Sequence, residues 1–100
     1  MRVRVLEVHP QDGYKLRLRF QDRAEGIVDI ATLIPFDGVF ARLRDRSFFE
    51  QVRVDQEPGT IAWPGNLDLD PYTLYVEATG KELHLKNGAV VRPSVVASRR

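Results

Sequence analysis

The segment from Gly59 to Tyr75, GTIAWPGNLDLDPYTLY, constrains the fold most because it contains the end of a strand, a turn and the start of a helix. Thr60 to Trp63 are mostly residues that favour β-strands. Pro64-Gly65 follows at once, and this pair ends a strand and begins a turn. The segment therefore predicts a strand that ends near Trp63.

The second part of the segment predicts a helix. Asp70 is suited to the N-cap, Pro71 suits the first helical position, and Leu69 and Leu74 have the spacing of a hydrophobic staple. Gly80 follows as a plausible end of the helix. The residues predicted to have structural roles are Trp63, Pro64, Asp70, Pro71 and Leu74.

The first thirty residues predict a three-stranded antiparallel meander. Apolar and basic residues alternate over 14–20, which is the clearest strand signal in the chain. Residues 2–8 and 27–30 read as its neighbours. Leu6 and Val8 break the alternation of the first strand, which indicates either a bulge or burial on both faces.

The middle of the chain predicts short helices and a second hairpin. Thr32, Asp37 and Asp45 are each candidates to cap a helical turn. Residues 51–55 then alternate again and are expected to pair with 60–63. These elements together predict a two-layer α+β fold, in which a β-meander is followed by short helices, a second β-hairpin and a short C-terminal helix.

The length of 100 residues predicts a single core. We expect residues 1–80 to form a compact α+β domain and 81–100 to form a C-terminal extension. In that extension Asn87-Gly88 favours a tight hairpin turn, and the basic end is of a kind that usually frays.

Composition excludes several classes of protein. The formal net charge is +1 and there are no cysteines, so neither a global attraction to nucleic acid nor a thiolate site is expected. No apolar run approaches the roughly 20 residues that cross a bilayer, and the first residues do not have the pattern of a signal peptide. A cytoplasmic protein without membrane association is expected.

Few residues suggest reaction chemistry. His9 and His84 are isolated in sequence from any set of metal ligands. Asp68 and Asp70, with Asn66, could gather a hard cation, but the capping role of Asp70 favours a structural interpretation. We therefore predict no catalytic, cofactor-binding or metal-binding residues and expect that the protein is not an enzyme.

A row of basic residues is the strongest candidate for a binding face. Strand alternation is expected to place them on one side of a sheet, and they are Arg2, Arg4, Lys15, Arg17 and Arg19. One interpretation, which we favour, is a solvated face where Asp22, Glu25 or Asp29 pairs with the arginines. The other is a docking face for an acidic protein or a nucleic acid backbone.

The order of these motifs resembles a prokaryotic family, the domain of unknown function 2442. The most specific part is Thr60-Ile61-Ala62-Trp63-Pro64 followed by Asp68-Leu69-Asp70-Pro71. The other matching residues are 14–20, Asp22, 26–30, Phe40, Leu43, Asp45, Phe48, Gly59 and 72–75. The resemblance implies a small α+β domain. The family is similar to the N-terminal domain of some helix-turn-helix proteins, and other members stand beside a second small protein, as in a toxin–antitoxin pair.

This chain departs from the family pattern in the first hairpin turn. Asp22-Arg23 replaces the usual Asp-Gly, so a turn that needs positive φ is less expected here than a longer loop to Gly26. The segment after Gly80 is also too short for a helix-turn-helix domain.

These observations favour a non-enzymatic module that binds a small partner protein and could be the antitoxin-like or regulatory member of a two-protein system. The alternative is a nucleic-acid-binding module that uses the basic face. An unpaired strand edge in the second hairpin or the tail would also allow a homodimer.

Overall fold

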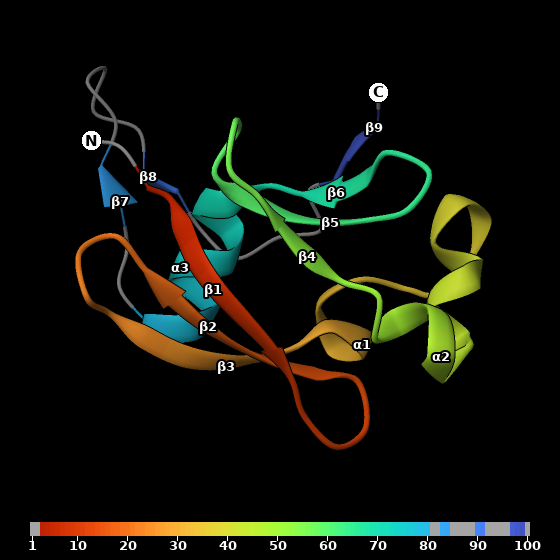
Figure 1. The fold of residues 1–100 in the computed structure, drawn as a ribbon. Coiled ribbons are helices and arrows are strands. Elements are labelled where there is room, and N and C mark those ends of the chain that lie inside the picture. Colours follow the sequence, from red (N-terminus) through yellow and green to blue (C-terminus); the bar gives the residue numbers. More distant parts are fainter. Residues whose placement is uncertain (1–2, 81–82, 85–89, 92–96, 100) are drawn as a thin grey trace.

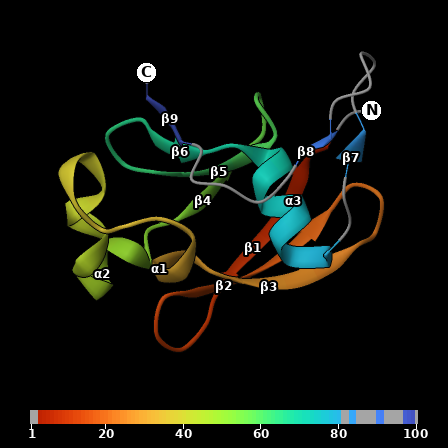
Figure 2. The ribbon, with the colours of Figure 1, turned by 180° about the vertical axis from the view of Figure 1, so that it is seen from behind.

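The computed structural model describes residues 3–80, 83–84, 90–91 and 97–99. Two antiparallel sheets pack with short helices around one core, and Figures 1 and 2 show this arrangement from opposite sides. The α+β class predicted from the sequence is confirmed. The elements are β1 (Val5–Pro10), β2 (Lys15–Phe20), β3 (Glu25–Asp29), α1 (Ile30–Leu33), the 3₁₀ helix η1 (Gly38–Arg44), α2 (Arg46–Phe49), β4 (Arg53–Asp55), β5 (Thr60–Trp63), β6 (Leu67–Leu69), α3 (Pro71–Thr79), β7 (Leu83–His84), β8 (Val90–Val91) and β9 (Ala97–Arg99).

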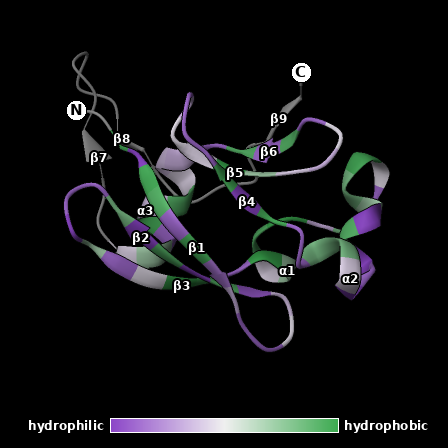
Figure 3. Cartoon of the chain, in the orientation of Figure 1, coloured by the Kyte–Doolittle hydropathy of each residue, from purple (hydrophilic) through white to green (hydrophobic). Residues whose placement is uncertain are grey.

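The first sheet is the predicted meander, with strand order β1-β2-β3. Its inner face comes from the alternation along β2, because Leu16, Leu18 and Phe20 are buried. Figure 3 shows hydrophobic and hydrophilic residues alternating along the strands of this sheet. Helix α3 lies against β3, and the view from behind in Figure 2 shows the helix in front of the sheet.

A bulge in β1 explains the broken alternation of the first strand. The register changes between Val5, which faces Phe20, and Glu7, which faces Arg19. Leu6 is the extra residue and is 45% exposed. Of the two interpretations left open by the sequence, the structure has the bulge, and this bulge places Glu7 and His9 opposite the arginines of β2.

The turn between β2 and β3 differs from the expected longer loop. The loop ends before Glu25, and the Phe20 N–H donates to the Ala24 carbonyl at 2.9 Å. Arg23 itself takes the left-handed conformation, with φ 75°. Asp22 supports the turn, since its carboxylate accepts from the Ala24 N–H at 2.9 Å. The tight turn is therefore kept, at the cost of strain in a residue that has a side chain.

The short helices begin at aspartates. Asp45 caps α2 by accepting from the Ser47 N–H at 2.9 Å, as predicted. Asp37 is at the N-cap position of η1 but makes no capping hydrogen bond with its side chain. Asp29 caps α1, so Thr32 is inside the first helix rather than at its start. The prediction for Thr32 was wrong because the strand runs directly into the helix at Asp29.

The second sheet has the order β4-β5-β6-β9 and includes the predicted pairing of β4 with β5. Strand β6 was not predicted, since three residues between a turn and a helix cap are too few for a visible alternation. Strand β9 pairs with β6 where the sequence predicted a frayed tail. In the extension, β7 pairs with β8, and the turn expected at Asn87-Gly88 lies outside the described residues.

Helix α3 has both of the expected ends. The Asp70 carboxylate accepts from the Thr73 N–H at 3.0 Å, and Pro71 is the first helical residue. Gly80 closes the helix with φ 73°, and its N–H donates to the Val76 carbonyl at 2.8 Å.

An aromatic cluster joins the helices to both sheets. The Tyr14 ring makes edge-to-face contacts with Phe36 and Phe49, each with a centroid distance of 5.1 Å. Phe49 also packs against Trp63, and its carbonyl accepts the indole N–H of Trp63 at 2.9 Å. Trp63 and Leu74 are both fully buried. The strand end and the helix start that the sequence singled out thus contribute side chains to one core.

Candidate functional site

The structure brings together three residues of the predicted basic row. Lys15, Arg17 and Arg19 project from the outer face of β2, where they alternate with its buried apolar residues. Arg4 lies elsewhere: its guanidinium donates to the Gln56 carbonyl, and its side chain lies next to Gly59. Arg2 is outside the described residues.

Two of these three cations are paired with carboxylates. An Arg17 Nη2 atom lies 2.8 Å from Glu25 Oε1 on β3. Arg19 Nε donates to Glu7 Oε2 on β1 at 2.7 Å, and a second guanidinium nitrogen of Arg19 contacts the same carboxylate. Glu25 was among the acids predicted as partners. Glu7 was not, because the bulge that brings it opposite Arg19 is not apparent from alternation alone.

The Glu7 carboxylate has two partners in the outer face. Its Oε1 atom lies 3.1 Å from His9 Nε2, while Oε2 accepts from Arg19. The hydrogen bond from Arg19, and then that from His9, lowers the pKa of Glu7 below its ordinary value of 4.5. On the outer face, Arg17 and Arg19 are therefore compensated by carboxylates, and the carboxylate of Glu7 is held ionised.

The other two acids predicted to pair with the arginines have different partners. Asp29 is the cap of α1. Asp22 accepts a hydrogen bond from the Tyr75 hydroxyl on α3. That hydrogen bond, together with burial and the nearby negative charge, raises the pKa of Tyr75 above 10.0. The hydrogen bond from Tyr75 to Asp22 fastens helix α3 to the turn between β2 and β3.

The residues considered for a cation do not form one site. Asp70 is engaged at the helix cap, Asp68 is buried in β6, and Asn66 is exposed in the turn before it. Over the described ranges, no group of three His, Cys, Asp or Glu side chains is arranged to hold a metal ion. The histidine of β7 has no described side chain, and His9 contacts Glu7.

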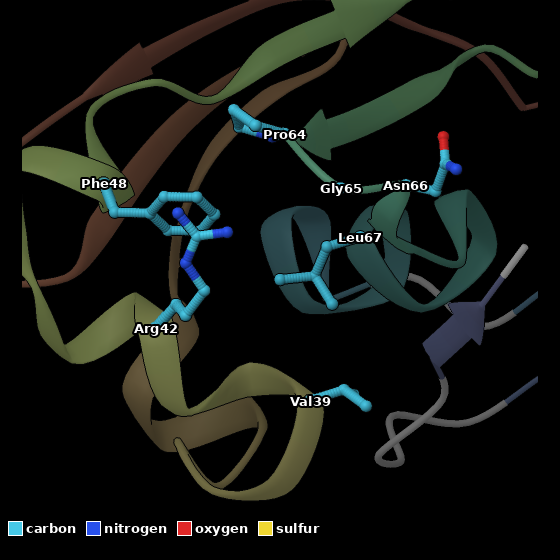
Figure 4. A pocket seen from close by; sticks show the side chains of 7 residues that line it. All are labelled: Val39, Arg42, Phe48, Pro64, Gly65, Asn66 and Leu67. Atoms are coloured by element: carbon cyan, nitrogen blue, oxygen red, sulfur yellow. The ribbon is translucent and has the colours of Figure 1, made fainter.

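A surface pocket that sequence patterns did not indicate lies between the short helices and the second sheet (Figure 4). We call it the Arg42 pocket. It has a volume of about 450 Å³ and is lined by Val39, Arg42, Phe48, Pro64, Gly65, Asn66 and Leu67. Figure 4 shows the Leu67 side chain pointing toward Phe48 and Arg42, whereas the Asn66 side chain points away from them.

Three separate segments build the Arg42 pocket. Helix η1 supplies Val39 and Arg42, α2 supplies Phe48, and the β5–β6 turn supplies the opposite wall. The turn owes its shape to two successive residues with positive φ, Gly65 at 90° and Asn66 at 61°. Because these segments are far apart in sequence, no single sequence motif indicates the pocket. In the structure, one of its lining residues, Val39, is an apolar side chain that is 41% exposed.

The most distinctive group in the pocket is the Arg42 guanidinium. Its central carbon lies 4.0 Å from the centroid of the Phe48 ring, which is a cation–π contact. Phe48 is buried, so the ring is a fixed platform. Within the part of the chain that the structure describes, Arg42 forms no ion pair. The arrangement presents a positioned cation, without a carboxylate partner among the described residues, beside apolar side chains.

No helix among the described residues has both the length and the apolar character needed to cross a membrane.

Comparison with known proteins identifies the family. The family model described as protein of unknown function (DUF2442) matches residues 5–80, which include both hairpins and helix α3. No curated protein and no solved structure matches the chain. The match agrees with the resemblance seen in the strand that ends at Trp63 and in the helix opened by Asp70 and Pro71. The chain therefore belongs to the DUF2442 family of proteins of unknown function.

Proposed function

We propose that this domain is a non-catalytic module that binds another protein, as the antitoxin-like or regulatory member of a two-protein system. The Arg42 pocket is the observation that carries the proposal. It combines apolar walls with an arginine stacked on an aromatic ring. Arginine and aromatic residues are enriched at protein interfaces and provide much of their binding energy.

The polar side chains of the pocket support binding rather than proton transfer. They are the guanidinium of Arg42 and the amide of Asn66. An arginine remains protonated throughout the physiological range, and an amide does not titrate there. Groups of this kind orient a partner through hydrogen bonds and charge.

The outer face of the first sheet supports a protein partner over a nucleic acid. Arg17 and Arg19 are engaged by Glu25 and Glu7, so phosphate groups would have to compete with carboxylates already in place. Ile27 on β3, which faces Arg17 across the strands, is 55% exposed. A non-obligate protein interface is about as apolar as the rest of a protein surface, so a mixed face of this kind suits a protein partner.

Nucleic acid binding remains the second candidate because Lys15, Arg17 and Arg19 lie side by side on β2. Such binding would use phosphate contacts, so the logarithm of the association constant would fall linearly with the logarithm of the salt concentration. Replacing Arg17 and Arg19 by glutamate would then abolish it. Arg44→Glu with Arg53→Glu is the charge-matched control, since both residues are exposed and lie outside the first sheet.

The test of the proposed function begins with gentle affinity purification from native lysate and identification of bound protein and nucleic acid. Each protein found is then purified and mixed with the chain, and the molar mass is measured by size-exclusion chromatography with light scattering. We expect a stoichiometric heteromeric complex. If the chain elutes alone or only as a homodimer with each candidate, or binds only nucleic acid with a steep salt dependence, the proposal is wrong.

A further inference from the structure

The Arg42 pocket has an orientation of charge that points to a particular class of partner. The central carbon of the guanidinium lies over the Phe48 ring, 4.0 Å from its centroid, so the ring covers one side of the cation. The N–H groups of a guanidinium lie in its plane and point away from a stacked ring. They can therefore meet a carboxylate in the two-pronged geometry that arginine favours.

Arg42 differs from Arg46 in its partners. Arg46, in the next helix, lies 3.4 Å from Glu50 and also donates to the Gln11 carbonyl. Arg42 is exposed and has no such carboxylate among the described residues. A negative group from outside the chain would thus provide the missing countercharge.

The shape of the pocket favours a protein segment over a small molecule. Phe48 and Leu67 are its buried floor, while the other lining residues are exposed. Sites for small ligands usually enclose most of the ligand surface, which an open hollow of this kind cannot do. Its volume of about 450 Å³ nevertheless gives room for side chains that project from a neighbouring surface.

We infer that the Arg42 pocket binds a short segment of the partner protein in which an Asp or Glu side chain lies next to an apolar side chain. The carboxylate pairs with the Arg42 guanidinium, and the apolar side chain packs against Val39 and Leu67. This inference rests on the proposed function, because it specifies the chemistry of the partner and the place where it binds.

The first experiment titrates the ¹⁵N-labelled chain with the peptide acetyl-Leu-Glu-Leu-amide and follows its NMR spectrum. We expect saturable shifts centred on the Arg42 side-chain N–H and the amides of Val39, Gly65 and Leu67. Two control ligands accompany this peptide. Acetyl-Leu-Gln-Leu-amide lacks the charge, and sodium acetate provides a carboxylate without the apolar side chains. A comparable response to either of them, or shifts centred elsewhere, would overturn the inference.

The second experiment uses variants. Arg42→Gln should weaken peptide binding roughly tenfold or more, because it removes a charge-assisted pair. Arg44→Gln is the matched control on the same helix, outside the pocket, and should leave binding unchanged. Val39→Ser changes an exposed side chain, so it should leave the fold intact and still weaken binding several-fold. Unaltered affinity in both Arg42→Gln and Val39→Ser would contradict the inference.

The same variants separate this inference from the proposed function. If a purified partner binds the wild type, Arg42→Gln and Val39→Ser equally well, the pocket is not the docking site although the chain is an interaction module. If no protein binds the wild type, the proposed function fails, and the peptide titration still decides whether the pocket recognises an acidic and apolar segment.

Discussion

Gly26 on β3 lies so close to Ala78 on α3 that a Cβ atom at Gly26 would be 2.0 Å from the Ala78 carbonyl oxygen. The close approach lets the helix pack directly on the edge strand of the meander. The contact lies within residues 5–80, the span of the family match. Asp22, in the turn before β3, is also tied to α3, because it accepts a hydrogen bond from Tyr75. The absence of a side chain at Gly26 is therefore a condition for the two layers to meet.

The first prediction is that Gly26→Ala destabilises the fold. Because the clash is with backbone, the helix must shift, and overpacking of this kind costs about 1–3 kcal/mol. Urea unfolding followed by circular dichroism measures the loss. Gly13→Ala measures backbone strain without a clash, since Gly13 has open space around it but a φ of 67°, which costs a residue with a Cβ roughly 1–2 kcal/mol. Equal stability of Gly26→Ala and the wild type would contradict the described approach of α3.

The second prediction is that Arg23→Gly stabilises the protein. Arg23 has φ 75°, and a left-handed residue with a Cβ costs roughly 1–2 kcal/mol. Glycine loses more chain entropy on folding, which offsets about 0.4–1 kcal/mol of the gain. A net increase of up to about 1.6 kcal/mol is expected in thermal or urea unfolding.

Asn66→Gly is the comparison for Arg23→Gly. Asn66 also has positive φ, 61°, but asparagine tolerates this conformation well, so the gain should be smaller. A loss of stability in Arg23→Gly would mean that the turn at Arg23 has a different conformation.

The third prediction concerns the start of α3. Asp70→Ala removes the bond from the Thr73 N–H to the capping carboxylate and should cost about 1 kcal/mol, with a range of about 0.5–2. Asp37→Ala provides a matched control, because Asp37 is at an N-cap position without a side-chain capping bond. Comparable losses in the two variants would show that the cap at Asp70 has no special role.

The fourth prediction concerns acid stability. The pKa of Glu7 is lowered in the folded state, so its carboxylate favours folding above the ordinary pKa of 4.5. That contribution is lost as the pH falls through the lower, folded-state pKa. Glu7→Gln should therefore be less stable than the wild type at pH 7, and the difference should shrink as the pH falls below 4.5.

The measurement is urea unfolding of Glu7→Gln and wild type over a series of pH values. The expected difference is small, because the Arg19 and Glu7 side chains are 40% and 42% exposed and water screens the pair. Glu57→Gln is the control, as Glu57 is exposed and forms no ion pair within the described ranges. If the stability difference between Glu7→Gln and the wild type grows as the pH falls, the prediction is wrong.

The amino-acid sequence by itself determined the features that depend on near neighbours. Alternation along residues 14–20 determined which side chains of β2 are buried, because successive residues in a strand point to opposite faces. The cap at Asp70 and the end at Gly80 were readable because capping chemistry acts within one turn of a helix. The family resemblance rests on the same local motifs.

Only the tertiary structure decided which distant groups meet. The pairing of Glu7 with Arg19 depends on a bulge, and the strain at Arg23 is accepted because the strands on either side, and the bond from Tyr75 to Asp22, hold the turn. The Arg42 pocket exists because residues 39–48 pack beside residues 64–67. Local propensity extends over a few residues, whereas the placement of these segments follows from burying one shared apolar core.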